Sequence, residues 1–115
     1  MLERPSIGEI EMTGTALFAR KCNVVDNKGN VCELTITFYS PEEDKKYDCY
    51  LAFVELKCDF FSRTLRGGGE DEAQAFFWLP KVVTAYLIGQ RRFGFEAYWL
   101  EPGDLDYADF WTYKQ

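Results

Sequence analysis

The sequence contains no histidine, and this absence bears first on catalysis. Histidine is the side chain that most often acts as a general acid or base near neutral pH, and it is the commonest nitrogen ligand of metals. Without it, a nucleophilic serine or cysteine needs a carboxylate or a lysine as its base. Nothing in the sequence places two of the nineteen acidic residues across one bond, as glycoside hydrolysis requires. We therefore expect neither an enzyme nor a bound cofactor, and a hydrolase is the third-ranked alternative.

Long apolar runs are also absent, since no stretch approaches the roughly 18 residues of a transmembrane helix. Residues 1–5 have neither the basic start nor the apolar run of a signal peptide. These two absences predict no membrane partner and a cytoplasmic location.

Basic residues are in the minority, because 13 Lys and Arg stand against 19 Asp and Glu, and the net charge is −6. Such a chain repels nucleic-acid phosphates and anionic membranes. A predicted helix separates two arginine pairs by roughly 27 Å, so they do not form one basic stripe. The pairs are Arg63 with Arg66 and Arg91 with Arg92. We expect no nucleic-acid partner, and a basic protein as the electrostatic complement.

The four cysteines are too far apart in sequence for a C-x-x-C zinc knuckle. They are Cys22, Cys32, Cys49 and Cys58. Within apolar strand patterns and a reducing cytoplasm, small buried thiols are the favoured interpretation. A Cys-rich metal site or an oxidised pair is the alternative.

Aromatic residues are plentiful, with ten Phe, seven Tyr and three Trp. Apolar residues make up 47% of the chain and charged residues 28%, which are ordinary values for a globular protein. We expect residues 1–115 to form a single domain.

A β-hairpin is the clearest local prediction. Residues 15–26 and 32–39 have strand patterns, and the turn between them carries Gly29 where a positive φ is needed. A loop from residue 27 to 29 places Val24 opposite Cys32 and Cys22 opposite Leu34. Cys22 and Cys32 are then diagonal neighbours about 7–8 Å apart, too far for a disulfide.

Two further strands are predicted at 47–61 and 93–100, and the first is apolar on both faces, as in a central strand or one with a face awaiting a partner. Residues 1–14 suit a lead-in arm or a short edge strand. Residues 40–46 are predicted to be a solvated loop and residues 62–69 a flexible connection.

A helix is predicted from Asp71, as N-cap, to about Ile88. Pro80 within it should kink the helix or split it in two. The predicted core-facing stripe comprises Phe76, Leu79, Val83, Tyr86 and Leu87, widened by Ala73, Phe77 and Trp78. The order β-β-β-α-β predicts an α+β fold of two layers, with an antiparallel sheet of four or so strands and one main, Pro-kinked helix packed on one face.

Two motifs resemble known ligand-binding sites, but a simpler interpretation explains each of them better. The glycines at 67–69 precede a helix, as in phosphate loops, yet Glu70, Asp71 and Glu72 already place negative charge there. A hinge, or a close approach of the backbone to the helix, explains them better. The spacing of Asp104, Asp106 and Asp109 could suit Ca²⁺ or Mg²⁺, but lacks the glycine and terminal glutamate of an EF-hand. We expect no metal.

The segment Gly69-Glu70-Asp71-Glu72-Ala73-Gln74-Ala75-Phe76 resembles the Gly-x-Asp-x-x-Gln-Ala-apolar helix start of a family of small uncharacterised bacterial domains. The resemblance extends over residues 15–90, because the strands before that helix are similar to the pattern around Tyr47 to Leu56. Pro80 and the aromatic C-terminal segment depart from the family pattern. The resemblance implies an immunity protein of a toxin–immunity system.

The leading hypothesis is a small acidic immunity protein that binds and neutralises a basic toxin domain, such as a nuclease. Its predicted partner-binding residues are Asp104, Asp106, Tyr107, Asp109, Phe110 and Trp111, with Glu70 and Glu72 as second choice. The alternative is a small-molecule or peptide-binding module whose aromatic pocket lies between sheet and helix. Its predicted lining is Phe76, Trp78, Tyr86 and Trp99.

Overall fold

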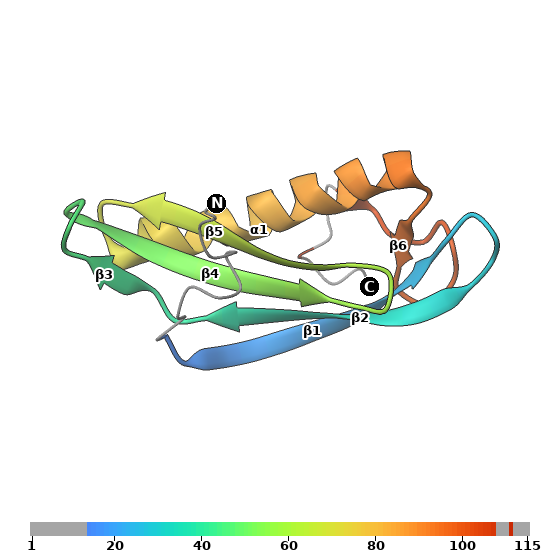
Figure 1. Cartoon of the computed structure of the whole chain (residues 1–115), viewed down its shortest axis with the longest axis horizontal. Helices are drawn as coiled ribbons and strands as arrows, with labels where there is room; N and C mark the ends of the chain where they lie inside the picture. The colour runs from blue at the N-terminus through green and yellow to red at the C-terminus, as the bar shows by residue number, and fades with distance from the viewer. Residues whose placement is uncertain (1–13, 108–110, 112–115) are drawn as a thin grey trace, which may run out of the picture.

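A computed structural model describes residues 14–107 and 111 (Figure 1). The elements are β1 (Ala16–Val25), β2 (Val31–Tyr39), β3 (Glu42–Asp44), β4 (Cys49–Lys57), β5 (Ser62–Gly69), α1 (Glu72–Gln90), the 3₁₀ helix η2 (Arg91–Phe93) and β6 (Glu96–Tyr98). The strands form one open antiparallel sheet, and α1 packs along it, against β5 and β4 in particular. The predicted α+β class and two-layer arrangement are confirmed.

The sheet is built around β4. β5 pairs with β4 from Tyr50 to Lys57, so β2 and β3 pair one after the other along the opposite edge of that strand. β1 pairs with β2, and β6 continues the sheet beyond β1. The prediction of a central strand is confirmed, because β4 buries Ala52 and Val54 on one face and Phe53 on the other.

The predicted hairpin register is confirmed at both positions. Val24 pairs with Cys32, and Cys22 pairs with Leu34. Gly29 has a φ of +89°, as the turn requires. The Asp26 carboxylate closes the loop by accepting hydrogen bonds from the backbone N–H groups of Lys28 and Asn30, at 2.9 and 2.8 Å.

Two segments predicted as connections are strands. The predicted loop 40–46 contains β3, and the predicted flexible connection 62–69 is β5. The glycines of β5 allow the helix to lie close to the strand. A Cβ on Gly67 would stand 2.6 Å from the carbonyl oxygen of Ala75 and 2.8 Å from the Cβ of Trp78. The close-approach interpretation of these glycines is therefore correct, and the hinge interpretation is wrong.

The helix begins as predicted. Asp71 is its N-cap, and the carboxylate of Asp71 accepts a hydrogen bond from the backbone N–H of Gln74 at 2.8 Å. The helix continues past Pro80 to Gln90, so the proline does not split it. Proline removes a single helical N–H donor, and packing of the flanking turns against the sheet is enough to preserve the helix.

The core lies between α1 and the helix-facing side of the sheet. The fully buried helix residues are spaced by four and are Ala75, Leu79, Val83 and Leu87, with Phe76 and Tyr86 partly buried beside them. The prediction that Ala73, Phe77 and Trp78 widen the core is wrong, because all three are exposed. At about 100° per residue, Phe77 points away from the row that starts at Ala75.

The predicted final strand is shorter than expected, since only Glu96–Tyr98 pairs with β1. The expectation for residues 1–14 lies outside the described residues except at Gly14. Within residues 14–107 and 111, no helix is long and apolar enough to span a bilayer.

Candidate functional site

The predicted C-terminal site begins in the loop after β6, and the side chain of Asp104 holds this loop together. The carboxylate of Asp104 accepts hydrogen bonds from the backbone N–H groups of Trp99, Leu100 and Glu101, at 2.8, 2.8 and 2.9 Å. Desolvation tends to raise the pKa of this carboxyl, but those hydrogen bonds outweigh it and hold the pKa below its ordinary value. Asp104 thus has a structural role in the loop, whereas Asp106 is exposed on its surface.

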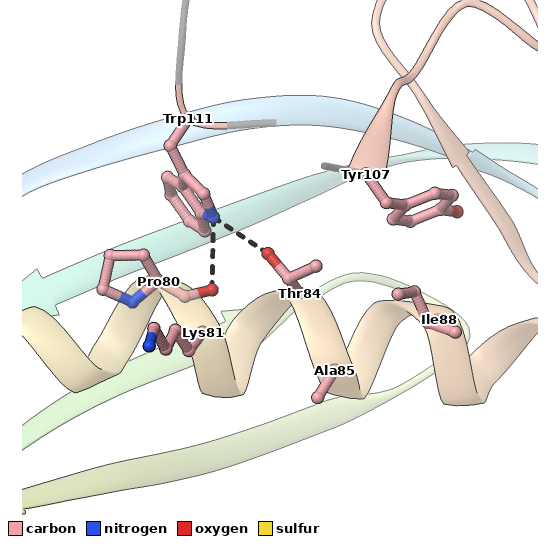
Figure 2. Close-up of a pocket in the computed structure, with 7 residues that line it drawn as sticks. All are labelled: Pro80, Lys81, Thr84, Ala85, Ile88, Tyr107 and Trp111. Atoms are coloured by element: carbon pink, nitrogen blue, oxygen red, sulfur yellow. Dashed lines mark hydrogen bonds between the residues drawn. The ribbon is translucent and has the colours of Figure 1, made fainter. Parts of the chain in front are cut away.

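The two described aromatic residues of this site are half-buried and turned toward the fold (Figure 2). The indole N–H of Trp111 donates to the carbonyl oxygen of Pro80 at 3.1 Å and to the hydroxyl oxygen of Thr84 at 2.9 Å. Its ring meets that of Phe38 edge to face, with centroids 5.5 Å apart. The ring of Trp111 therefore fastens the C-terminal segment to the helix and the core.

Tyr107 is held in a similar way. Its hydroxyl donates to Oε2 of Glu96 at 3.5 Å, and the guanidinium of Arg91 lies over its ring at 5.4 Å. Burial, and then the nearby Glu96 carboxylate, raise the pKa of Tyr107. Asp109 and Phe110, the other two residues of the predicted site, lie outside the described residues.

A shallow groove of about 360 Å³ runs along α1 beside these rings (Figure 2). Its lining is Pro80, Lys81, Thr84, Ala85, Ile88, Tyr107 and Trp111. The four residues predicted to line a pocket between sheet and helix do not line one pocket. Phe76 packs on Phe38, Tyr86 packs on Phe61, and Trp99 lies under the guanidinium of Arg20. Trp78, the fourth, is 45% exposed.

The second-choice residues, Glu70 and Glu72, flank the N-cap at the start of α1 and are exposed. The backbone N–H of Glu70 donates to Oε1 of Gln74 at 2.6 Å, so that side chain helps to cap the helix. The pairing of β4 with both β3 and β5 brings this helix start to the same end of the sheet as β3 (Figure 1). The carboxylates gathered there, called the acidic end below, are Glu43, Asp44, Asp48, Glu70, Asp71 and Glu72.

Exposed aromatic rings adjoin the acidic end, and two of them are residues that the helix pattern predicts in the core. Phe77 is 69% exposed and Trp78 is 45% exposed on the second turn of α1. The ammonium of Lys81 lies over the Trp78 ring at 5.0 Å, and a shallow groove of about 330 Å³ is lined by Gln74, Phe77, Trp78 and Lys81. Tyr47, in the turn after β3, is 68% exposed.

The sequence does contain a pattern from which the exposure of these helix rings can be predicted. The residues 75, 79, 83 and 87 already supply one complete apolar row, and a helix of a two-layer fold buries only one side. Further rings in the same helix must then lie outside that row. Aromatic residues beside charged ones at such positions indicate a contact surface more than a core.

The positions of the described acidic and cysteine side chains show whether they could hold a metal ion or supply a nucleophile. Among residues 14–107 and 111, no group of three or more Cys, Asp or Glu side chains is placed to hold a metal ion. Burial raises the pKa of the Cys22 thiol to about 12, which makes it a poor nucleophile near neutral pH. What the described surface offers chemically is carboxylates beside large rings, which suits recognition of a cationic surface.

Comparisons of the chain with protein-family models, with curated proteins and with solved structures find no match in any of the three.

Proposed function

We propose that this protein is a small acidic inhibitor that binds a basic protein domain through its acidic end, as a bacterial immunity protein binds a toxin nuclease. The observation that carries the proposal is the exposure of Phe77 and Trp78, at 69% and 45%, on the same helix start as Glu70 and Glu72. Large apolar rings in water beside a charged rim have the composition of a binding hot spot.

Charge supports the same kind of partner. The chain carries a net charge of −6, and a nuclease must present a positive groove to nucleic-acid phosphates. An acidic surface is steered toward such a groove and can occupy it. Two lysines, Lys45 and Lys46, lie in the turn of the acidic end, but the six carboxylates outnumber them.

We move the proposed contact surface from the C-terminal segment to the helix start. Tyr107 and Trp111 already have partners within the fold, and the Asp104 carboxylate is satisfied by three backbone N–H groups. Glu70, Glu72, Phe77 and Trp78 are exposed instead. We therefore assign the main contact to the second-choice acids together with the exposed helix rings, and keep Asp106 as a peripheral residue.

The test is co-expression with a panel of basic bacterial nuclease toxin domains, starting with the product of the gene next to this one. We expect one toxin to be neutralised and to form a complex whose association rate falls as salt is raised. Phe77→Ala should weaken that complex by roughly 30-fold or more. The double variant Glu70→Lys with Glu72→Lys should lower the association rate by about tenfold.

Matched controls come from the same chain. Phe93 is also 69% exposed but lies beyond the other end of α1, so Phe93→Ala should leave the complex unchanged. Glu101→Lys reverses one charge on the loop after β6 and is compared with Glu70→Lys alone. The proposal is wrong if no toxin is neutralised, or if the Phe77 and Phe93 variants bind equally well.

A second candidate function is the capture of a short apolar peptide in the groove beside Trp111. The observation in its favour is the mostly apolar lining of that groove, from Pro80 to Ile88. If this is the function, the Phe77→Ala variant should keep full affinity while Ile88→Glu loses it. The opposite pattern supports the acidic end.

A further inference from the structure

The outward side of α1 carries a row of exposed residues, called the outer row below. At about 100° per residue, this row lies opposite the buried row that packs on the sheet. Its spacing of three and four residues is that of a helix that packs on another helix. Phe77, Trp78 and Ile88 are its large apolar members, and they are 69%, 45% and 44% exposed. A helix that is apolar on both sides is typical of one that is covered on both sides. The outer row comprises Gln74, Phe77, Trp78, Lys81, Ala85 and Ile88.

Two shallow grooves along the outer row meet at Lys81, which lines both. The groove toward the start of α1, of about 330 Å³, carries the large rings of Phe77 and Trp78. The groove toward the end of α1, of about 360 Å³, has the small residues Thr84 and Ala85 along the helix (Figure 2). One half of α1 therefore presents rings, and the other half presents space beside small side chains. The two halves are complementary in size.

The charges at the two ends of α1 are also complementary. Glu70 lies just before the N-cap, and Arg92 lies in η2, directly after the helix. Both residues are exposed, and both lie eleven positions from Lys81, which is the middle residue of α1. The helix thus has a carboxylate near one end and a guanidinium near the other, equally far along the chain from its midpoint.

We propose that α1 forms the interface of a homodimer, in which the outer row packs on the outer row of a second copy. The two helices run antiparallel, and the two-fold axis passes beside Lys81. This pairing places Phe77 opposite Ala85 of the second copy, and Trp78 opposite Thr84 of the second copy. A two-fold interface repeats each contact, so each copy inserts its rings beside the small residues of the other.

Charge selects this antiparallel arrangement. It brings Glu70 of each copy to Arg92 of the other, whereas a parallel pair would set Glu70 against Glu70 and Arg92 against Arg92. The macrodipoles of antiparallel helices also attract each other. The partner that fits is a second copy of this chain, because it supplies a small residue for each ring and an opposite charge for each end at the matching position.

Two features keep this dimer weak. Each copy carries a net charge of −6, so the two copies repel one another at long range. The two Lys81 side chains also meet near the axis, although each ammonium lies over the Trp78 ring of its own chain at 5.0 Å. We expect a dissociation constant on the order of 10 μM. A basic partner domain that binds more tightly can then displace the second copy and reach Phe77 and Trp78.

Sedimentation velocity of the full-length protein, over a concentration series that spans this constant, tests the dimer. We expect the wild type to pass from monomer to dimer as its concentration rises. Phe77→Ala should weaken the dimer roughly tenfold or more, because it removes the same ring contact twice. Leu17→Ala, at a residue that is 49% exposed on β1, should leave the dimer unchanged. A wild type that stays monomeric, or equal dimerisation of the Phe77 and Leu17 variants, overturns the proposal.

A charge exchange tests the antiparallel register. Glu70→Arg and Arg92→Glu should each dimerise roughly tenfold more weakly on their own, since each homodimer then sets like charges together twice. An equimolar mixture of the two should recover the wild-type affinity, because both end pairs of the mixed dimer again join opposite charges. Arg66→Glu controls for net charge, since Arg66 is exposed on β5, and its mixture with Glu70→Arg should stay weaker. Equal recovery in both mixtures, or recovery in neither, overturns the proposal.

The dimer does not rest on the proposed function, since neither experiment contains another protein. A monomeric wild type overturns the dimer and leaves the proposed function untouched. Failure to neutralise any toxin overturns the proposed function and leaves the dimer untouched.

Discussion

The indole N–H of Trp111 donates to the hydroxyl oxygen of Thr84 at 2.9 Å, so the C-terminal segment is fastened to the middle of α1. The sequence marks Trp111 as a partner-binding ring, and this contact gives it a role inside the fold as well. The two roles predict different effects of substitution.

For Trp111, we expect replacement to lower stability. Trp111→Phe keeps a ring against Phe38 but loses the N–H, and should reduce the free energy of unfolding by about 1 kcal/mol. Trp111→Ala removes the ring and should reduce it by about 3 kcal/mol. Urea denaturation measures both, and Thr84→Val removes the acceptor for comparison. Unchanged stability in Trp111→Ala would show that the ring does not anchor the segment.

Neighbouring positions of α1 should respond very differently to truncation. Leu79 is fully buried, and Leu79→Ala should lower the free energy of unfolding by about 2–5 kcal/mol. Phe77 is 69% exposed, and Phe77→Ala should change it by less than about 0.5 kcal/mol. Chemical denaturation of the two variants tests which face of the helix meets the sheet. A large loss for Phe77→Ala would contradict its outward placement.

The glycines of β5 offer a matched pair. A Cβ on Gly67 would overlap the backbone of α1, so Gly67→Ala should destabilise the protein by about 1–3 kcal/mol. A Cβ on Gly68 would find its nearest atom, Cδ2 of Leu51, at an ordinary 3.7 Å. Gly68→Ala should be neutral or slightly stabilising, because alanine restricts the unfolded chain. Melting temperatures of the two variants test the close approach of helix and strand.

Acid should weaken the loop that Asp104 closes. Its pKa in the folded protein lies below the ordinary value of 3.8, so the carboxylate contributes stability that is fully present above that value. This contribution is lost as the pH falls through the folded-state pKa. Asp104→Asn should therefore be less stable than the wild type near pH 6, and the difference should shrink toward pH 2. Glu43→Gln controls for the loss of one surface charge, and the titration is followed by urea denaturation at each pH.

Features that depend on residues close together in the sequence were predictable from the sequence. The turn at Gly29 and the alternation on either side of it determine which residues face one another, and the observed pairs Val24–Cys32 and Cys22–Leu34 agree. Asp71 caps the helix as predicted, because the hydrogen bond to the N–H of Gln74 spans only three positions.

The strand character of β5 was not predictable in the same way. Ser62–Gly69 carries three consecutive glycines, which are poor strand formers, and only pairing along the whole of β4 makes the segment a strand. The tight packing of Ala75 against β5 then requires glycine at positions 67 and 69, where a Cβ would stand 2.6 Å from the backbone of Ala75. Composition alone suggested a flexible connection, because the partner that orders it is distant along the chain.

The sequence by itself determined the hairpin register, the start of the helix and the α+β class, since each follows from side-chain periodicity and from hydrogen bonds between residues close in the chain. Only the tertiary structure decided that Phe77 and Trp78 are exposed to water and that Trp111 reaches Thr84. The physical reason is that a helix or strand pattern specifies which residues share a face. Which face is buried, and what lies against it, depends on elements that meet only after the chain has folded.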